Sequence, residues 1–272
     1  MFRPKLANYR AFLVDLDGVL IRGDEPLPGA AEGVETLKEI GRVAVFSNNS
    51  TRSRREFAAR LQGLGFAVHR EEVVNSAYVA ARYLLDQAGP TSVFVIGEAG
   101  LEEELELAGH RLTGPEEARF LIAGMDRGLT YEKLSQALQA LLRGAEFIAT
   151  NADPTFPTPQ GQVPGAGAIV GAITGMGFPP EEIVGKPSPV AFKVALDAAE
   201  VGDPKECLLI GDRPETDILG AKQSGLDSAL VLTGVGQLED LRGTKFRPTW
   251  VAESLADLVG IELEEDRPPR RE

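Results

Sequence analysis

Two short apolar runs of the sequence, centred near residues 13 and 209, are each followed by acidic side chains. The four acids are Asp15, Asp17, Asp212 and Asp217. Carboxylates that converge within a few Å repel one another, and one of them protonates unless a cation is supplied. Mg²⁺ suits such a cluster, because it binds one or two carboxylates together with waters and a substrate phosphate. The four acids therefore indicate a divalent-metal site.

Polar groups elsewhere in the chain have the chemistry to hold an anionic ligand of that metal. Ser47 and Asn48 follow the apolar run Val43–Phe46, and Lys186 stands just ahead of an expected helix. Lys186 can offset the charge of an anionic ligand, and Pro187 biases it toward an extended conformation. Taken alone, Ser47-Asn48 is more typical of a turn or a helix cap.

The sequence alternates between short apolar runs, typical of buried strands, and amphipathic helical patterns. The expected strands are Phe12–Val14, Val43–Phe46, Val93–Ile96, Phe120–Ala123, Phe147–Ala149, Cys207–Ile210 and Ala229–Leu232. The expected helices are Gly29–Ile40, Arg54–Leu64, Ala77–Gln87, Leu134–Leu142, Val190–Ala199 and Thr216–Ser224. This alternation predicts an α/β fold with a doubly wound parallel sheet covered by helices. Ligands of such sheets bind at the carboxyl ends of the strands, where the acids and Ser47 are expected.

The composition excludes several classes of protein. The 272 residues include 28 Lys and Arg against 41 Asp and Glu, which gives a formal net charge of −13. A surface that wraps nucleic acid depends on clustered Lys and Arg, so no nucleic-acid partner is expected. No apolar stretch approaches the roughly 18 residues of a membrane span, and residues 1–10 do not resemble a signal peptide. We therefore expect a cytoplasmic protein with no membrane partner.

Several side chains that often carry chemistry have a structural interpretation here. Cys207 lies in an apolar run and is expected in the core rather than as a nucleophile. With two histidines and one cysteine, a Cys/His zinc cluster has too few ligands. His69 and His110 lie in polar stretches and are expected at the surface, and the run Glu102-Glu103-Glu104 is expected to be solvated.

Four motifs occur in order along the chain. They are Asp15-x-Asp17-Gly18-Val19-Leu20, Ser47-Asn48-Asn49-Ser50, Gly185-Lys186-Pro187 and Gly211-Asp212-x-x-x-Thr216-Asp217. Together they resemble the haloacid dehalogenase (HAD) superfamily of phosphohydrolases, over residues 9 to 260. The stretch Thr150–Asp153 and the Gly-rich run Pro164–Gly171 resemble its NagD-like branch, which includes the 4-nitrophenyl phosphatases.

That resemblance implies a Rossmann-like HAD core with a second, inserted α/β cap domain. The core would consist of residues 1–80 and 184–262, the cap of residues 81–183, and a flexible tail of residues 263–272. The cap is expected to choose the substrate and to mediate a homodimer. Its candidate substrate contacts are Asn151, Asp153 and Phe156, which an ordinary turn explains equally well. Pyridoxal phosphate phosphatases have a His about where Phe156 stands, which disfavours a pyridoxal substrate.

The resemblance also implies roles in phosphoryl transfer. Asp15 would be the nucleophile, which attacks phosphorus to give an aspartyl phosphate. Asp17 would be the general acid that protonates the leaving oxygen, and then the base that activates water. Ser47, the Asn48 segment and Lys186 would bind the phosphoryl oxygens, and Lys186 would offset their charge.

The Mg²⁺ ligands implied by the resemblance are the carboxylates of Asp15 and Asp212 and the carbonyl of Asp17. Asp217 would orient a water or Lys186 from just outside the ligand set. The expected function is Mg²⁺-dependent hydrolysis of small phosphorylated metabolites, such as nucleotides, sugar phosphates, phosphoglycolate or 4-nitrophenyl phosphate. An acid at position 17 favours a phosphatase over a dehalogenase, because halide leaves without a proton.

Two alternatives stay open. The first is a HAD phosphotransferase or mutase, which such a large cap disfavours. The second is a signalling or binding module that accepts a phosphoryl group on Asp15 without turnover, as response-regulator receivers do on an Asp beside Mg²⁺ and a Lys. Those receivers are shorter and have no inserted cap.

Overall fold

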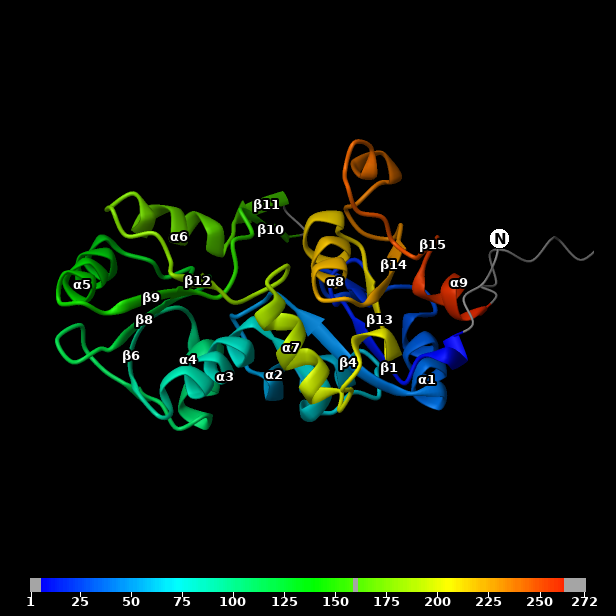
Figure 1. Ribbon diagram of the computed structural model, residues 1–272, viewed down its shortest axis with the longest axis horizontal. Helices are drawn as coiled ribbons and strands as arrows, with labels where there is room; N and C mark the ends of the chain where they lie inside the picture. Colours follow the sequence, from blue (N-terminus) through cyan, green and yellow to red (C-terminus); the bar gives the residue numbers. More distant parts are fainter. Residues whose placement is uncertain (1–5, 159–160, 262–272) are drawn as a thin grey trace, which may run out of the picture. The chain divides into compact units, whose positions relative to one another are not determined.

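The structure is a computed structural model, and it describes residues 6–158 and 161–261 (Figure 1). The expected flexible tail, residues 263–272, lies outside the described residues. The chain divides into two compact units, each assembled from separate segments. The first consists of Met1–Phe46, Ala59–Val73 and Ala195–Glu272, and the second of Ser47–Ala58 and Val74–Val194. The four acids therefore belong to the first unit, and Ser47 and Lys186 belong to the second.

A six-stranded sheet contains the strands that end at the acids. Its strands are β1 (Ala11–Val14), β4 (Arg42–Ser47), β5 (Val73–Asn75), β13 (Cys207–Gly211), β14 (Asp227–Val231) and β15 (Trp250–Ala252), in the order β15-β14-β13-β1-β4-β5. Every residue of β1 and β13 is buried, which explains their unbroken apolar sequence. The two strands are parallel, with Val14 opposite Ile210. Asp15 and Asp212 therefore leave the sheet at the same edge, from neighbouring strands.

Helices and turns complete this part of the chain. Helix α1 (Ala30–Ile40) packs on α9 (Leu255–Val259), and a π-helical turn, Pro214–Ile218, carries Asp217 into α8 (Leu219–Gln223). A short hairpin of β2 (Ile21–Arg22) and β3 (Glu25–Pro26) follows Asp17. Helices α2 (Arg54–Gly63) and α7 (Pro189–Ala198) each run from one unit into the other. The 3₁₀ turns are Leu6–Asn8, Arg70–Glu72, Pro204–Glu206 and Leu238–Leu241.

The second unit contains its own five-stranded parallel sheet. Its strands are β6 (Ser92–Ile96), β7 (Arg111–Leu112), β8 (Phe120–Ala123), β9 (Glu146–Ala149) and β12 (Glu182–Ile183), in the order β12-β9-β8-β6-β7. Helices α5 (Tyr131–Leu142) and α6 (Ala166–Thr174) cover one face, and α3 (Ser76–Ala88) and α4 (Ala99–Leu107) cover the other (Figure 1). Strands β10 (Thr155–Thr158) and β11 (Gly161–Pro164) form a separate antiparallel hairpin. The core between α5, α6 and the sheet includes Leu121, Phe147 and Ile173.

These elements confirm the predicted α/β class with a second α/β part. Each expected strand and helix is present, with shifts of a few residues at the ends. The expected helix Thr216–Ser224 is divided between the π-helical turn and α8. The sequence pattern did not predict the remaining helices and strands, which are α4, α6, α9, β2, β3, β5, β7, β10, β11, β12 and β15.

Two expectations about polar residues are wrong. His110 is buried rather than at the surface; its Nδ1 accepts the Thr91 N–H (3.3 Å), so Nε2 carries the proton and donates to the Ala81 carbonyl (3.0 Å). Glu104 is buried rather than solvated, because α4 packs on α3 and turns its side chain inward toward Arg54. The expectation for Cys207 is confirmed: it is fully buried, and burial raises the pKa of its thiol to about 12.

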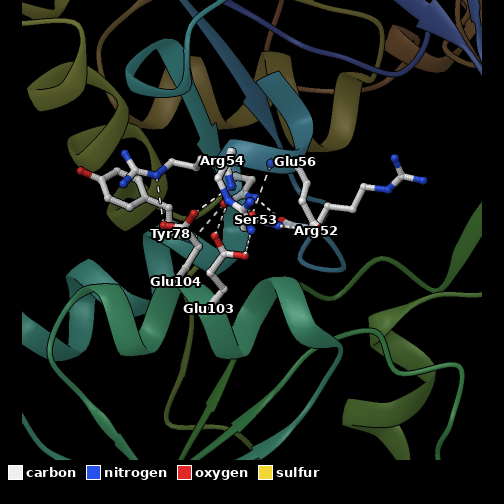
Figure 2. A network of polar contacts seen from close by, with 9 residues as sticks. Arg52, Ser53, Arg54, Glu56, Tyr78, Glu103 and Glu104 are labelled. Atoms are coloured by element: carbon white, nitrogen blue, oxygen red, sulfur yellow. Dashed lines mark hydrogen bonds and ion pairs between the residues drawn. The ribbon is translucent and has the colours of Figure 1, made fainter. Parts of the chain in front are cut away.

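The buried Glu104 fixes the start of α2 (Figure 2). Its Oε1 accepts the backbone N–H of Arg54 at 2.8 Å, and its Oε2 accepts the Arg54 Nε–H at 3.0 Å. The guanidinium carbon of Arg54 lies 3.6 Å from the centre of the Tyr78 ring. Gly100 of α4 packs so closely on Arg52 that a Cβ there would overlap the Arg52 backbone. The segment that follows Ser47-Asn48 is thereby held by α3 and α4.

None of the helices in residues 6–158 and 161–261 is both long and apolar enough to cross a membrane.

Candidate active site

Three buried carboxylates meet at the carboxyl edge of the six-stranded sheet. Asp15, Asp212 and Asp217 each place one oxygen within 4.8 Å of the others. Asp15 follows β1 directly and Asp212 follows β13, while the π-helical turn brings Asp217 back toward them. The backbone N–H of Arg213 donates to Asp217 Oδ2 at 3.0 Å. A Cβ on Gly211 would overlap the Asp217 carboxylate, so glycine at 211 is what allows this close approach.

The two carboxylate oxygens of Asp212 differ in their hydrogen bonding. Oδ2 accepts the backbone N–H of Val235 at 2.8 Å. Oδ1 is buried and has no hydrogen-bond partner within the described part of the chain. A buried acceptor without a partner costs about 1–3 kcal/mol, and more when it is charged. Oδ1 of Asp212 is therefore available to a ligand that supplies positive charge.

The electrostatics of the cluster favour a cation. Burial, together with the charges of Asp15 and Asp217, raises the pKa of Asp212 to about 8. The Val235 N–H and the Arg213 charge oppose this shift without cancelling it. A divalent cation would remove the repulsion among the carboxylates and would satisfy Oδ1. The cluster offers only oxygen atoms as ligands, which suits Mg²⁺ or Ca²⁺ rather than the softer metals. The residues present therefore fit a divalent metal.

Asp17 lies in the turn between β1 and the β2–β3 hairpin. It is half-buried, and its backbone forms a bridge with Ile21. The next residue, Gly18, has a φ of 86°, a conformation that glycine adopts readily. A Cβ on Gly18 would lie 2.6 Å from Oδ2 of Asp212, so this turn passes directly over the Asp212 carboxylate. The carboxylate of Asp17 is not among the three clustered ones.

In the second unit, Asn48 connects the Ser47 segment to Lys186. Asn48 Oδ1 accepts the backbone N–H of Lys186 at 2.7 Å, and Asn48 Nδ2 donates to the Lys186 carbonyl at 3.0 Å. The Asn48 carboxamide thus pairs with both the backbone N–H and the backbone carbonyl of Lys186. The Lys186 side chain is buried, and the Lys186–Pro187 peptide bond is cis. Ser47 is also buried, and its Oγ accepts the Asn49 N–H at 3.2 Å.

Two of the three expected substrate contacts join this same network. Asn151 is buried and its Nδ2 donates to the Asn48 carbonyl at 2.8 Å. Asp153 accepts from Asn48 Nδ2 at 3.2 Å, and its N–H donates to Asn151 Oδ1 at 3.1 Å. Phe156 lies in β10, opposite Val163 of β11, and is half-buried. The structure therefore brings Asn48, Asn151 and Asp153 together with the Lys186 backbone and places Phe156 in the hairpin.

The loop that holds Asp212 was not expected from the sequence pattern. This loop follows β14 and contains Thr233, Gly234, Val235 and Gly236. A Cβ on Gly234 would overlap the Asp212 carboxylate, and a Cβ on Gly236 would overlap the Asp212 carbonyl oxygen. The available signal was two glycines, Gly234 and Gly236, separated by one residue and shortly after an apolar strand.

Comparisons with known proteins agree with this geometry. The model of the family described as haloacid dehalogenase-like hydrolase matches residues 12–111, and a second, HAD-hydrolase-like model matches residues 183–258. An acid sugar phosphatase of Staphylococcus haemolyticus is 34% identical over 247 residues, which cover 90% of this chain and 93% of that protein. The chain therefore belongs to the haloacid dehalogenase-like hydrolase family.

Two solved structures narrow the class. A p-nitrophenyl phosphatase from Archaeoglobus fulgidus matches with a TM-score of 0.88 and 38% identity, over 93% of this chain and 98% of that one. A glycerol phosphate phosphatase from Mycobacterium tuberculosis, in complex with magnesium, matches with a TM-score of 0.86 and 33% identity, over 94% of this chain and 78% of that one. The resemblance predicted from the four motifs is confirmed. This chain is an enzyme, a phosphatase of the NagD-like branch.

Proposed function

We propose that this phosphatase hydrolyses small phosphate monoesters with Mg²⁺ through an aspartyl phosphate on Asp15. The observation that carries the proposal is the buried cluster of Asp15, Asp212 and Asp217, in which one oxygen of Asp212 has no partner among the described residues. Clustered carboxylates can hold a cation beside a phosphate, because the positive cation attracts both. The Mycobacterium tuberculosis relative in complex with magnesium supports the choice of Mg²⁺.

Each acid near the cluster has a distinct part in the proposed reaction. A carboxylate oxygen of Asp15 attacks phosphorus, a new O–P bond forms, and the bond to the leaving oxygen breaks. Asp17 donates a proton to that leaving oxygen and later takes a proton from the attacking water. Asp15, Asp212 and the Asp17 carbonyl would hold the Mg²⁺, which supplies charge neutralisation for the phosphoryl group. Asp217 would orient a water or Lys186.

Groups of the second unit would bind the phosphoryl oxygens. Ser47 offers a hydroxyl and Lys186 an ammonium group, and the backbone N–H of Asn48 is a third donor. The Asn48 side chain is already paired with the Lys186 backbone, so its proposed contribution is through its N–H and through the placement of Lys186. Residues 81–183 remain our proposal for the cap that selects substrates, with Asn151, Asp153 and Phe156 as its candidate contacts.

The substrate class follows from the relatives. The sugar, glycerol phosphate and p-nitrophenyl phosphatases are named for small monoesters. We therefore propose sugar phosphates, glycerol phosphate and related small metabolites, with nucleotides and phosphoglycolate as further candidates. Cytoplasmic location, a homodimer through the cap and the absence of a nucleic-acid partner stay predictions.

A phosphate-ester panel tests the proposal. The purified protein is assayed with Mg²⁺ and with EDTA, beside the variant Asp15→Asn and the control Asp197→Asn, which changes an exposed aspartate of α7. We expect activity with Mg²⁺ only, a loss on the order of 1,000-fold or more in Asp15→Asn by the scale of a removed nucleophile, and wild-type rates in the control. Equal rates for Asp15→Asn and wild type would refute the mechanism. A long-lived phosphorylated Asp15 without turnover would instead favour the signalling alternative.

A further inference from the structure

The loop after β14 touches both segments that carry the acids of the first unit. We call residues 232–236 the 232–236 loop. Its Val235 N–H donates to Oδ2 of Asp212, which follows β13. Its Thr233 hydroxyl donates to the Gly18 carbonyl at 2.6 Å, in the turn that carries Asp17. One short loop therefore holds two segments that are far apart in the chain.

A second contact ties the same loop to the β2–β3 hairpin. The Arg22 guanidinium donates to the Thr233 carbonyl at 2.6 Å. The Thr233 hydroxyl therefore contacts Gly18, the residue after Asp17, and the Thr233 carbonyl contacts Arg22 in β2. Asp17 precedes Gly18 and Arg22 in the chain, so these two contacts with the 232–236 loop restrain the backbone of Asp17.

The turn at Gly18 and the 232–236 loop pack tightly against each other. A Cβ on Gly18 would lie 2.8 Å from the Gly234 Cα and 2.6 Å from Asp212 Oδ2. Real Cβ atoms do not approach other atoms so closely, so the two glycines are in direct contact over the Asp212 carboxylate. The turn can be displaced only away from Asp212. The Thr233 hydroxyl opposes that displacement, because it holds the Gly18 carbonyl from the opposite segment.

We propose that Thr233 is a positioning residue that keeps Asp17 in line to protonate the leaving group. This inference rests on the proposed function and assigns that function a further residue. Thr233 does not contact the reacting atoms in the proposal; it acts through the Gly18 carbonyl. Loss of the hydroxyl would leave the Gly18 carbonyl without this donor and would free the Asp17 turn, while the Val235–Asp212 hydrogen bond would persist.

The leaving group separates positioning of Asp17 from a general structural effect. Nitrophenol departs with little help from an acid, whereas an alkoxide such as that of glycerol needs the proton. The ratio kcat/KM reports only the steps up to release of the leaving group, so the later hydrolysis of the aspartyl phosphate does not enter it. A misplaced Asp17 therefore lowers kcat/KM for glycerol phosphate much more than for 4-nitrophenyl phosphate.

The experiment compares Thr233→Val with Thr233→Ser on these two esters with Mg²⁺. The control is Thr36→Val, whose hydroxyl donates to the Glu32 carbonyl within α1. We expect Thr233→Val to lose roughly tenfold in kcat/KM on glycerol phosphate, the scale of one hydroxyl hydrogen bond. The loss on 4-nitrophenyl phosphate should stay below about twofold, since that ester needs little acid help. Thr233→Ser and Thr36→Val should match wild type on both.

Calorimetric titration with Mg²⁺ gives a readout independent of turnover, and Thr233→Val should bind Mg²⁺ as wild type does. An equal loss on both esters, or no loss on either, would overturn the positioning role. If Thr233→Val fails to fold, Arg22→Met removes the neighbouring contact and must show the same selective loss on glycerol phosphate for the inference to stand. A wild-type protein that hydrolyses neither ester would instead refute the proposed function itself.

Discussion

Replacing Asp212 with Asn should stabilise the metal-free protein while it removes metal binding. The substitution keeps the shape of the side chain and deletes its charge. In the folded chain the new carboxamide oxygen can accept the Val235 N–H, as Oδ2 does now, and its NH₂ group would face the carboxylates of Asp15 and Asp217. Metal-free wild type relieves the repulsion among the three acids only by holding a proton on Asp212, whereas the carboxamide supplies a donor without binding one.

The size of the effect follows from the pKa of Asp212. Burial and the neighbouring acids raise this pKa from 3.8 to about 8 in the folded protein. Between these two values the folded chain holds a proton that the unfolded chain does not, so stability falls by about 1.4 kcal/mol for each unit of rising pH. At pH 7, about three units above the ordinary pKa, the cost is on the order of 4 kcal/mol. The variant Asp212→Asn carries no such cost, and we expect it to recover about 2–4 kcal/mol.

Chemical denaturation in EDTA, at pH values from 4 to 8, measures this difference. Wild type should lose stability as pH rises from 4 to 8, and Asp212→Asn should lose less, with the two proteins converging near pH 4. Addition of Mg²⁺ at about 100 times its dissociation constant should stabilise wild type by about 2.7 kcal/mol and should leave Asp212→Asn nearly unchanged. The exposed-site variant Asp197→Asn should behave as wild type throughout.

If Asp212→Asn in EDTA is no more stable than wild type at pH 7, burial of Asp212 among the acids does not destabilise the metal-free fold. If both proteins gain equally from Mg²⁺, the cation binds elsewhere.

Three smaller predictions concern other side chains. Glu104→Gln should destabilise the protein by about 3 kcal/mol, because it leaves the Arg54 charge without its partner; denaturant titration measures this. Asn48→Asp should lower kcat roughly tenfold or more, since its Nδ2 donor to Lys186 is lost and a second carboxylate faces Asp153; steady-state assays check it. Cys207 should react with a thiol reagent only after denaturation, because it is fully buried with a raised pKa.

The strands and the acids at their ends could be predicted because the signal is local. A strand buried on both faces has a short apolar sequence, and a polar residue after it marks the point where the chain leaves the sheet. The register then decides which ends are neighbours, and Val14 opposite Ile210 brings Asp15 and Asp212 together. The weaker elements lacked that signal: β5 and β15 are short, and α4 has three consecutive acids near its centre.

Contacts between distant segments could not be predicted from the sequence pattern. Glu104 belongs to a run of acids, and only the packing of α4 on α3 shows that its partner is Arg54, 50 residues earlier. Asn48 meets the Lys186 backbone across 138 residues. His110 is comparable, because its two partners are backbone groups of other segments. In each case the side chain is polar by type, and its partners belong to segments far away in the sequence.

The carboxylate cluster links the stability of this fold to its proposed chemistry. Gly18, Gly211 and Gly234 allow backbone and side chains to crowd around Asp212 and Asp217 more tightly than any Cβ would permit. That crowding excludes water, and it is the main reason that the pKa of Asp212 is raised. The same exclusion strengthens the attraction between the acids and a cation, because the local dielectric is low. A larger residue at these glycines should therefore weaken metal binding and, where it admits water, lower the pKa of Asp212 together with it.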